Sequence, residues 1–600
     1  MVLFGLDFGT TFSSLCVFKS GKIVALKQQN SAYIPTYLFL HANSDDMVYG
    51  YDAETLSTSG EIRGGFFRDL KRWVGCDESN VQEYIDKLKP HYSVTMAPYG
   101  AGSKKIPVLG AYSGDTSMTA SLAGLISYFI RSIVTSACEA FTCECTGLVV
   151  SVPANYDCMQ RSFTENCANL SGFTCVYMMN EPSAAALASC SKVGMSLKNL
   201  LVYDFGGGTF DVSVISARNQ TFVVKASGGD MNLGGRDVDR AFREELYSIA
   251  GLPVDNEIDV SALKETLSKI SFPIKYNIKS TDGRQATVMV EPSLLNKVMK
   301  PFVERTVGIM RDVFNKYIKN MGLHQSGSKV SLVLVGGSSY LPGLKALLGS
   351  IDFVLEIIDL ADARAAVAAG CALYSSCITS ESSMLLVDCA SHNLSVPTGT
   401  GESIVLLPAG APIPFNGTRN INLNRCTRTA CYTPALFEGE YLKCARNRKI
   451  FSGTVVLSSL GVTTTVPTTI LLRLETEVSS VGTVKFFIVG PSNEKILVGG
   501  KPAYDFSRET LRTRYVADLH KSNFNRVLLM LALTRTAKSR SRLTEPEKSR
   551  VESYTEVKDV EREYKRYSNN DDSILPFCRV LLGNTVQKIL RGARLEELPF

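Results

Sequence analysis

The residues best suited to chemistry in this chain are two aspartates that flank a glycine-rich turn. Asp204 ends an apolar run that predicts a buried strand, and Asp211 begins the expected return strand, 211–215. Between them, the three glycines 206–208 have no Cβ, so backbone N–H groups can close on an anion. The two carboxylates suit a site that holds phosphate together with a metal. A glycine-rich hairpin turn in a large β-rich protein is the alternative.

A second copy of this pattern lies near the start of the chain. The sequence Asp7-Phe8-Gly9 repeats at 204–206, about two hundred residues later, and again separates an apolar run from a return strand. Two similar domains, each with a hairpin loop and an aspartate, suggest that one nucleotide's phosphates are clamped between them. Neither loop has the P-loop pattern GxxxxGK[ST], and GxGxxG is absent.

Apolar periodicity predicts the elements that carry the other polar candidates. Lys71 falls in a short helical stretch, 67–75, but off the apolar face that Leu70 and Trp73 make, so periodicity alone favours a solvated lysine. Glu181 begins a small-residue helix, where it is either a cap or an acid near metal-bound water. The other expected elements are a helix over 116–140, a strand over 146–152, a helix over 157–171 and a strand over 174–178.

The composition predicts a soluble globular chain of three or more domains. The 600 residues are 45% hydrophobic and 20% charged, and the net charge of +6 is small for this length and does not indicate a dedicated nucleic-acid binder. We expect no transmembrane segment, because no uncharged apolar stretch reaches about 18 residues. The first strand begins at Val2, which leaves no room for a signal peptide and predicts a cytosolic protein.

The cysteines and histidines predict no metal centre. Seven of the 16 cysteines lie between Cys138 and Cys190, without a CxxC pair or a nearby set of histidines. In the cytosol we expect these cysteines to be reduced and to pack as small buried hydrophobes. The five histidines are scattered, and we assign none of them a role.

An ordered series of motifs points to a known family. The motifs are Asp7-Phe8-Gly9-Thr10-Thr11, Leu70-Lys71-Arg72, Val152-Pro153-Ala154, NEPSAAA at 180–186, DFGGGTFDVS at 204–213, GGDMNLGGRDVD at 228–239 and LVGGSSYLP at 334–342. In this order they resemble the ATPase domain of the 70-kDa heat-shock chaperones, within the actin and sugar-kinase superfamily. The resemblance extends over about 375 residues, which makes chance agreement implausible.

The resemblance implies ATP and Mg²⁺ as ligands. It implies that Asp7 and Asp204 hold Mg²⁺ through waters, and that Lys71 positions the attacking water and stabilises charge on the γ-phosphoryl group. Glu181 and Asp211 would orient water and metal. The implied catalytic residues are Lys71, Glu181, Asp211 and Thr209, and the implied nucleotide-binding residues are Gly9, Thr10, Thr11, Phe12, Gly206, Gly207, Gly208, Gly235, Lys264, Ser268, Gly336, Gly337 and Ser338.

The chain departs from the chaperone pattern on the adenosine side. Glu265 stands where the family usually has an arginine, Ser261 where it has a glutamate, and Tyr340 where it has an arginine. The stretch 364–368 (RAAVA) lacks the expected acidic pair at its start. These departures concern nucleotide affinity and base choice rather than the phosphate chemistry.

We predict an α/β fold with a two-lobed, actin-like ATPase domain, followed by a β-sandwich and a helical segment. The predicted parts are the ATPase domain over 1–380, an apolar interdomain linker over 381–389, the β-sandwich and partner-binding domain over 390–500, and a mainly helical domain over 501–600. A plain connecting strand is the alternative for the linker. The Lys/Arg-rich stretch 535–550 is interpreted as a solvated loop, with contact to RNA phosphates as the alternative.

The end of the chain resembles one branch of the family. It stops at 595–600 (LEELPF), without the glycine-rich tail and acidic terminus of cellular cytosolic chaperones. Nearly the whole chain resembles the heat-shock-70 homologues of closteroviruses, which are filamentous plant RNA viruses. The segments that carry this resemblance are 1–12, 70–76, 229–235, 336–343 and 590–592.

This resemblance implies a chaperone-like viral ATPase that takes part in virion tail assembly and in movement between cells through plasmodesmata. It implies viral coat, minor coat and other movement or virion proteins as partners, together with host plasmodesmal or cytoskeletal components. It also implies viral RNA as an indirect partner, and the expected locations are host cytoplasm, virion tail and plasmodesmata. A structural virion component that binds nucleotide without required turnover, and a general folding chaperone, are the alternatives.

Overall fold

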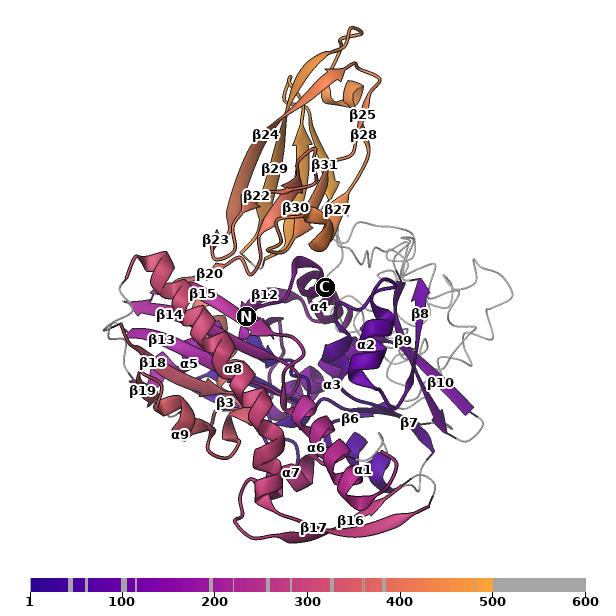
Figure 1. The fold of residues 1–600 in the computed structure, drawn as a ribbon, viewed down its shortest axis with the longest axis vertical. Coiled ribbons are helices and arrows are strands. Elements are labelled where there is room, and N and C mark those ends of the chain that lie inside the picture. The colour runs from indigo at the N-terminus through magenta and orange to yellow at the C-terminus, as the bar shows by residue number, and fades with distance from the viewer. Residues whose placement is uncertain are drawn as a thin grey trace, which may run out of the picture.

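Two mixed sheets with the same strand order form the body of the protein (Figure 1). The order is β12-β11-β1-β2-β3 in the first lobe, residues 2–180, and β19-β18-β13-β14-β15 in the second lobe, residues 181–379. The bounds are β1 (Leu3–Asp7), β2 (Phe12–Lys19), β3 (Lys22–Ala25), β11 (Gly147–Val152) and β12 (Cys175–Asn180), then β13 (Lys198–Phe205), β14 (Phe210–Arg218), β15 (Thr221–Asp230), β18 (Val330–Val335) and β19 (Val354–Ile358). The duplication follows the repeated Asp-Phe-Gly, and this mixed α/β architecture fits an actin-like ATPase.

The computed structural model describes residues 2–499, with gaps at 42–46, 60–62, 99–104, 114–115, 194–197, 219–220, 255–258, 281–282, 324–327, 359, 361, 380–384 and 481. The helical domain expected over 501–600 and the basic stretch 535–550 lie outside the described residues. The same holds for residues 381–384 of the expected linker.

Two small-residue helices cross between the lobes. Helix α5 (Glu181–Val193) packs on β13 and β14, whereas α10 (Ala366–Thr379) packs on β1 and β2. Their contact is close, because a Cβ added at Gly370 would lie only 1.9 Å from the carbonyl oxygen of Ala184. The lobes are therefore joined by helices whose backbones touch, as the alanine-rich stretch 184–186 allows.

The periphery of the first lobe differs from the expected pattern at one place. The helix predicted over 116–140 is instead strand β10 (Thr116–Ser121) followed by α3 (Leu122–Phe141). Pairing with β9 extends the first six residues, and Ser121 caps α3 by accepting a hydrogen bond from the Gly124 N–H at 3.2 Å. The remaining elements are β4 (Ile34–Pro35), β5 (Leu38–His41), β6 (Met47–Tyr49), α1 (Tyr51–Ser59), β7 (Gly64–Phe67), the 3-10 helix η1 (Leu70–Trp73), α2 (Val81–Leu88), β8 (Ser93–Pro98), β9 (Lys105–Ser113) and α4 (Cys158–Leu170).

The second lobe adds helices on one side of its sheet and a hairpin at its tip. The long helix α8 lies against β14 and β15, and its residues Val313 and Phe314 are buried in the apolar cluster of this lobe. The elements are α6 (Gly235–Ala250), α7 (Ser261–Leu267), β16 (Ile274–Lys279), β17 (Gln285–Val290), α8 (Pro292–Met321), the 3-10 helix η2 (Gly337–Tyr340) and α9 (Leu344–Gly349).

Residues 390–499, called here the β-rich region, contain two four-stranded antiparallel sheets. Their orders are β22-β21-β26-β27 and β24-β29-β30-β31, and both contribute to one buried apolar cluster that includes Leu394, Leu436, Leu472 and Phe486. The bounds are β21 (Leu394–Pro397), β22 (Ser403–Leu407), β23 (Pro412–Ile413), β24 (Phe415–Cys426), β25 (Cys431–Tyr432), β26 (Ala435–Glu438), η3 (Cys444–Arg446), β27 (Arg448–Ser452), β28 (Val455–Val456), η4 (Leu457–Leu460), β29 (Thr468–Val478), β30 (Val484–Val489) and β31 (Lys495–Gly499).

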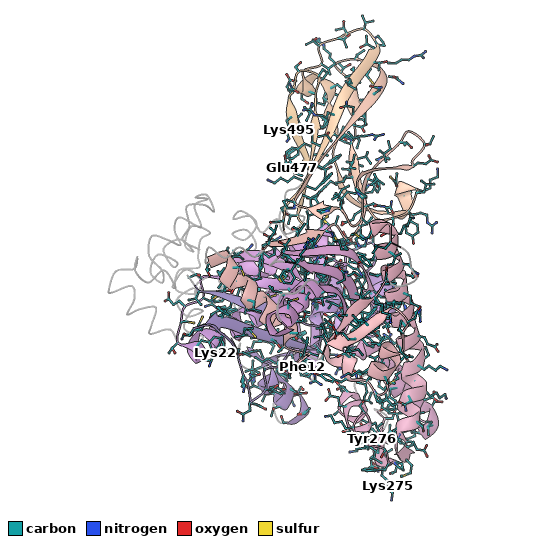
Figure 2. All side chains as sticks on the ribbon, turned by 90° about the vertical axis from the view of Figure 1, so that its left-hand side faces the viewer. Phe12, Lys22, Lys275, Tyr276, Glu477 and Lys495 are labelled. Atoms are coloured by element: carbon teal, nitrogen blue, oxygen red, sulfur yellow. The ribbon has the colours of Figure 1, made fainter. Side chains whose placement is uncertain are left out.

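Strand β20 (Leu385–Cys389) connects the second lobe to the β-rich region. It pairs in parallel with β15 and antiparallel with β23, so the sheet of the second lobe continues as far as the β-rich region. In Figure 2, Lys495 and Glu477 are labelled on the β-rich region, and Lys275 and Tyr276 on the β16 hairpin mark the opposite end of the molecule.

The β-rich region contacts the first lobe at the start of α4. Cys158 and Met159 of α4 are buried in the same apolar cluster as the two sheets. Glu438 accepts a hydrogen bond from the Cys158 N–H at 3.1 Å, and Arg448 forms an ion pair with Asp157. The loop before α4 is also bound, since the Asn155 carbonyl oxygen accepts a hydrogen bond from His392 Nε2 at 3.2 Å.

Each of the 15 cysteines that the structure describes is a free thiol. Eight of them are buried, as expected of small hydrophobes, but Cys431 is exposed, so that prediction is wrong for it. Within the described helices, none is both long and apolar enough to cross a membrane.

Candidate functional site

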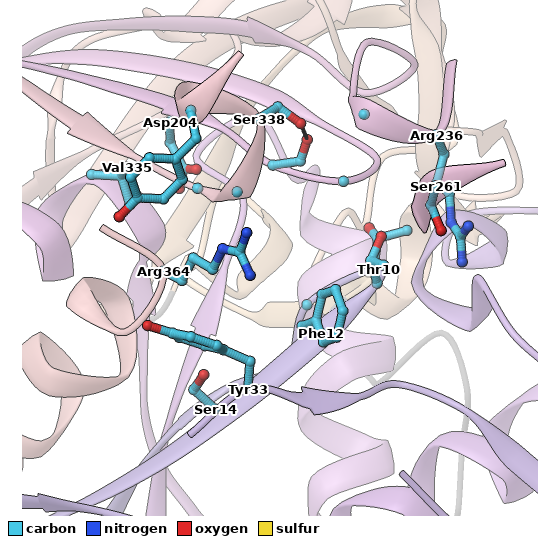
Figure 3. Close-up of a pocket in the computed structure, with 18 of the residues that line it drawn as sticks. Thr10, Phe12, Ser14, Tyr33, Asp204, Arg236, Ser261, Val335, Ser338 and Arg364 are labelled. Carbon is cyan, nitrogen blue, oxygen red and sulfur yellow. Dashed lines mark hydrogen bonds between the residues drawn. The ribbon is translucent and has the colours of Figure 1, made fainter. Parts of the chain in front are cut away.

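A cavity of about 660 Å³ opens between the two lobes (Figure 3). Residues of both lobes line it, and most of the residues singled out in the sequence are among them. These are Asp7, Gly9, Thr10, Thr11, Phe12, Lys71, Glu181, Asp204, Gly206, Gly207, Thr209, Gly235, Lys264, Ser268, Gly336, Gly337 and Ser338. Gly208 and Asp211 lie just behind this surface. The cavity thus collects residues that are far apart in the chain.

The two hairpin loops face each other across the cavity. A Cβ added at Gly207 would lie 2.1 Å from Thr11 Oγ1, and one added at Gly208 would lie 2.5 Å from Thr10 Oγ1. Any larger residue would push the loops apart. The Gly206 N–H donates to the Thr209 carbonyl oxygen at 3.1 Å and closes the second loop. The glycines therefore allow the contact between loops that a clamp for phosphates needs.

Lys71 is buried at the floor of the cavity and is not solvated as periodicity favoured. Its Nζ lies 2.5 Å from Glu181 Oε1, and the two side chains are only 5% and 8% exposed. Periodicity failed because Lys71 lies on the four-residue helix η1, whose environment is set by residues distant in sequence. Glu181 begins α5, but its carboxylate accepts a hydrogen bond from Lys71, so it is not merely a helix cap.

Three buried aspartates surround this ion pair. Burial and the nearby Glu181 carboxylate raise the pKa of Asp7 to about 7, although Lys71 and a hydrogen bond from Ser151 Oγ at 2.7 Å oppose the rise. The same two causes raise the pKa of Asp211 to about 7, and they hold the pKa of Asp204 well above its ordinary value. Burial alone would lower the pKa of Lys71, but Glu181 and Asp7 raise it.

The residues present fit a phosphate with its metal. Thr11 Oγ1 and Asp211 Oδ2 are buried and have no hydrogen-bond partner in the described part of the chain. Four carboxylates face a single lysine, so an added cation would relieve their repulsion. Within the described residues, no three acidic, histidine or cysteine side chains converge closely enough to bind a metal directly. Mg²⁺ held through waters by Asp7 and Asp204 stays a prediction.

Asp211 is fixed by the loop that also binds the β-rich region. It pairs with Asp204 across the β13–β14 hairpin, and its Oδ1 accepts a hydrogen bond from the Asn155 N–H at 3.3 Å. The carbonyl oxygen of the same peptide unit, that of Ala154, accepts a hydrogen bond from Ser391 Oγ. One loop thus contacts both a buried carboxylate of the cavity and the β-rich region.

The residues that the sequence assigns to the adenosine side line the same cavity as those of the phosphate side. Lys264 Nζ lies 2.7 Å from Asp239 Oδ1 and donates to the Gly235 carbonyl oxygen at 3.3 Å. Ser338 Oγ donates to the Gly206 carbonyl oxygen at 2.8 Å. Ser268 Oγ donates to the Lys264 carbonyl oxygen of its own helix at 2.8 Å, so this hydroxyl has a partner inside the protein.

Sequence reasoning missed the charged network that joins the lobes. Arg236 Nε donates to Asp69 Oδ1 at 3.0 Å, and its Nη1 donates to Asp259 at 3.0 Å. Beside Lys71, Arg72 donates to Asp237 Oδ1 at 3.0 Å. The signal was present, because Arg72 and Arg236 both lie within the matching motifs, but their partners belong to segments far away in sequence.

Comparisons with known proteins match these features. Residues 3–456 match a family model described as Hsp70 protein. The chain is 53% identical over 599 residues to the movement protein Hsp70h of Beet yellows virus, with 100% of both chains covered. It is 31% identical over 461 residues to the movement protein Hsp70h of Grapevine leafroll-associated virus 3, covering 75% of this chain and 79% of that protein. It is also 27% identical over 439 residues to the chaperone protein HscA of Escherichia coli, covering 71% and 67%.

Proposed function

This chain belongs to the Hsp70 family and, within it, to the closterovirus Hsp70 homologues, and we propose that it is a viral movement protein that binds and hydrolyses ATP between its two lobes. One observation carries the ATPase part of the proposal. A buried lysine lies at the floor of a cleft, beneath two facing loops and among four carboxylates. Phosphoryl transfer needs such placement and charge neutralisation more than covalent help.

The chain's own residues divide the work of hydrolysis. Backbone N–H groups of the loops at 9–12 and 206–209 hold the phosphates, except those of Gly9 and Gly206, which donate within the protein. Thr11 Oγ1 is available for a phosphate oxygen. Lys71 stabilises charge on the γ-phosphoryl group and positions the attacking water, and Glu181 holds its ammonium in place. Asp211, through its unpaired Oδ2, accepts a hydrogen bond from that water.

Asp7 and Asp204 would hold Mg²⁺ through waters, because Asp7 ends β1 and Asp204 is the next-to-last residue of β13, beside the two loops. When bound, Mg²⁺ neutralises charge on the phosphate oxygens. Binding of Mg²⁺ also offsets the repulsion among the four buried carboxylates. The chain should therefore bind ATP much more tightly in the presence of Mg²⁺ than after a chelator has removed the metal.

The test is calorimetric titration of the purified chain with ATP, together with release of phosphate at steady state. We expect binding that requires Mg²⁺ and a slow release of phosphate that the Asp7→Asn variant loses. The control is Asp352→Asn, which alters a carboxylate that is 83% exposed. Binding without any phosphate release would instead support the nucleotide-binding structural component.

We further propose that the β-rich region is a β-sandwich that binds viral coat, minor coat and other movement or virion proteins, and that it serves virion tail assembly and passage through plasmodesmata. Supporting this proposal, the region contacts the loop that also fixes Asp211, so its position is coupled to the nucleotide site. Asp7→Asn virus should move between cells more slowly than Asp352→Asn virus. Immunogold labelling of purified filaments should label one end. Equal movement of the two variants would contradict the ATP-driven role, and unlabelled filaments the virion role.

A further inference from the structure

Two tyrosines and an arginine meet in the cavity. The Arg364 guanidinium carbon lies 5.3 Å from the ring centroid of Tyr33 and 5.6 Å from that of Tyr340. Tyr33 belongs to the first lobe, just before β4, whereas Tyr340 ends η2 and Arg364 precedes α10 in the second lobe. Figure 3 shows Arg364 and Tyr33 on the left of the cavity, Thr10 to the right of them, and Ser261 and Arg236 farther right. The cation therefore bridges the lobes.

Backbone contacts fix Arg364 beside the turn at Gly336 and Gly337. The Arg364 N–H donates to Asp362 Oδ1 at 3.1 Å, and the Ala363 N–H donates to the Tyr340 hydroxyl oxygen at 3.3 Å. A Cβ added at Gly337 would lie 3.6 Å from Arg364 Nε. Arg364 thus packs on the 336–337 turn, over which the family resemblance places the adenosine, and it lines the cavity.

We propose that Arg364 is the base-binding residue of this protein, held in place by Tyr33 and Tyr340, and that it selects purine nucleoside triphosphates. The proposal rests on the function proposed above and names a residue that function did not assign. A planar guanidinium stacks on the π-face of a base, and the contact grows with the area of the ring system. The carboxylates of Glu265 and Asp362 also line the cavity and offer acceptors for the amino group of a purine.

The bridge also makes base binding depend on closure of the lobes. Tyr33 approaches Arg364 only when the first lobe lies against the second, because the two residues come from opposite walls of the cavity. A nucleotide that stacks on Arg364 therefore favours the closed arrangement. Loss of the Tyr33 ring should weaken ATP binding even though no contact with phosphate changes.

The experiment compares ATP, UTP and inorganic tripolyphosphate, each with Mg²⁺, by calorimetry on the full chain. For the unaltered protein we expect ATP to bind more tightly than UTP. Arg364→Gln should weaken ATP binding about tenfold and leave tripolyphosphate binding unchanged. Tyr33→Leu should weaken ATP binding about threefold, again without effect on tripolyphosphate. The control is Arg311→Gln, since Arg311 lies 5.7 Å from the Phe353 ring outside this cavity.

The outcomes separate this inference from the proposed function. Unaltered protein that binds neither ATP nor tripolyphosphate would overturn the function itself. Arg364→Gln protein that binds ATP as tightly as the unaltered chain would overturn the inference alone. So would an equal loss of ATP and tripolyphosphate binding, because Arg364 would then contact phosphate. Retained tripolyphosphate binding shows that each variant is folded, and Tyr33→Leu provides a second test if Arg364→Gln does not fold.

Discussion

Replacement of Lys71 by methionine tests both the stability and the chemistry of the buried ion pair. Methionine keeps the length of the side chain but removes its charge, so Glu181 is left among three buried aspartates. Removing one partner of a buried pair costs about 3–5 kcal/mol, because the other charge stays desolvated. With both Lys71 and Glu181 only 5% and 8% exposed, we expect Lys71→Met to lose a free energy of unfolding in that range.

The double variant Lys71→Met/Glu181→Gln separates the two contributions. It has no unpaired charge at this position, so we expect it to recover most of the lost stability and to lose less than about 2 kcal/mol. The assay is a urea titration, in which the free energy is taken from the first unfolding transition, because a chain of several domains does not unfold in one step. The control is Lys297→Met, because the Lys297–Glu245 pair is exposed and should change stability by less than about 0.5 kcal/mol.

Hydrolysis should respond differently from stability. Both the single and the double variant lack the ammonium that stabilises the transferring phosphoryl group, so we expect each to hydrolyse ATP about 10²–10³ times more slowly. Single-turnover phosphate release measures this step. A Lys71→Met protein that hydrolyses ATP at the original rate would refute the catalytic role. A double variant as unstable as the single one would refute the account of the ion pair.

Three further predictions concern packing, interface and pH. Gly370→Ala should lower the free energy of unfolding by more than about 3 kcal/mol, because the added Cβ would lie 1.9 Å from a backbone oxygen. The control is Gly308→Ala, whose Cβ would have nothing within 4 Å and which should stabilise the protein by about 0.5 kcal/mol. Arg448→Ala should loosen the β-rich region from α4 and speed amide hydrogen exchange over 154–160, and Arg446→Ala, which alters a ring contact inside the β-rich region, should not. Burial lowers the pKa of His91 from 6.5 to about 4, so the folded state takes up its proton less readily and stability is lost as the pH falls from about 6.5 toward 4. At pH 5 the loss is about 2 kcal/mol, and urea unfolding of His91→Asn should not show it.

The sequence predicted the two loops because their chemistry is local. An aspartate at a strand end followed by glycine leaves a readable pattern, and the repeat at Asp7 and Asp204 doubles that signal. The environment of Lys71 could not be read in the same way, since its partner Glu181 lies 110 residues away. Periodicity describes the faces of one helix, not the residues that a distant segment brings to them.

The same limit explains the residues that sequence reasoning missed. Arg236 bonds to Asp69 across the lobes, and Arg364 approaches Tyr33 from the opposite wall, so neither partnership leaves a mark on local spacing. The strand β10 was mistaken for the start of a helix for a related reason. Its extended form depends on pairing with β9, which the apolar pattern of 116–121 does not reveal.

The peptide group between Ala154 and Asn155 has partners on opposite sides, and its oxygen also accepts a hydrogen bond from Arg161 Nη2 at 3.4 Å. Its oxygen accepts from Ser391 of the β-rich region, and its N–H donates to Asp211 of the nucleotide cleft. Hydrogen bonds on the two ends of one amide polarise each other, so the hydroxyl of Ser391 makes the N–H a stronger donor toward the carboxylate. The region proposed to bind partners and the proposed chemical centre are therefore linked through one amide, whose oxygen accepts from Ser391 and whose N–H donates to Asp211.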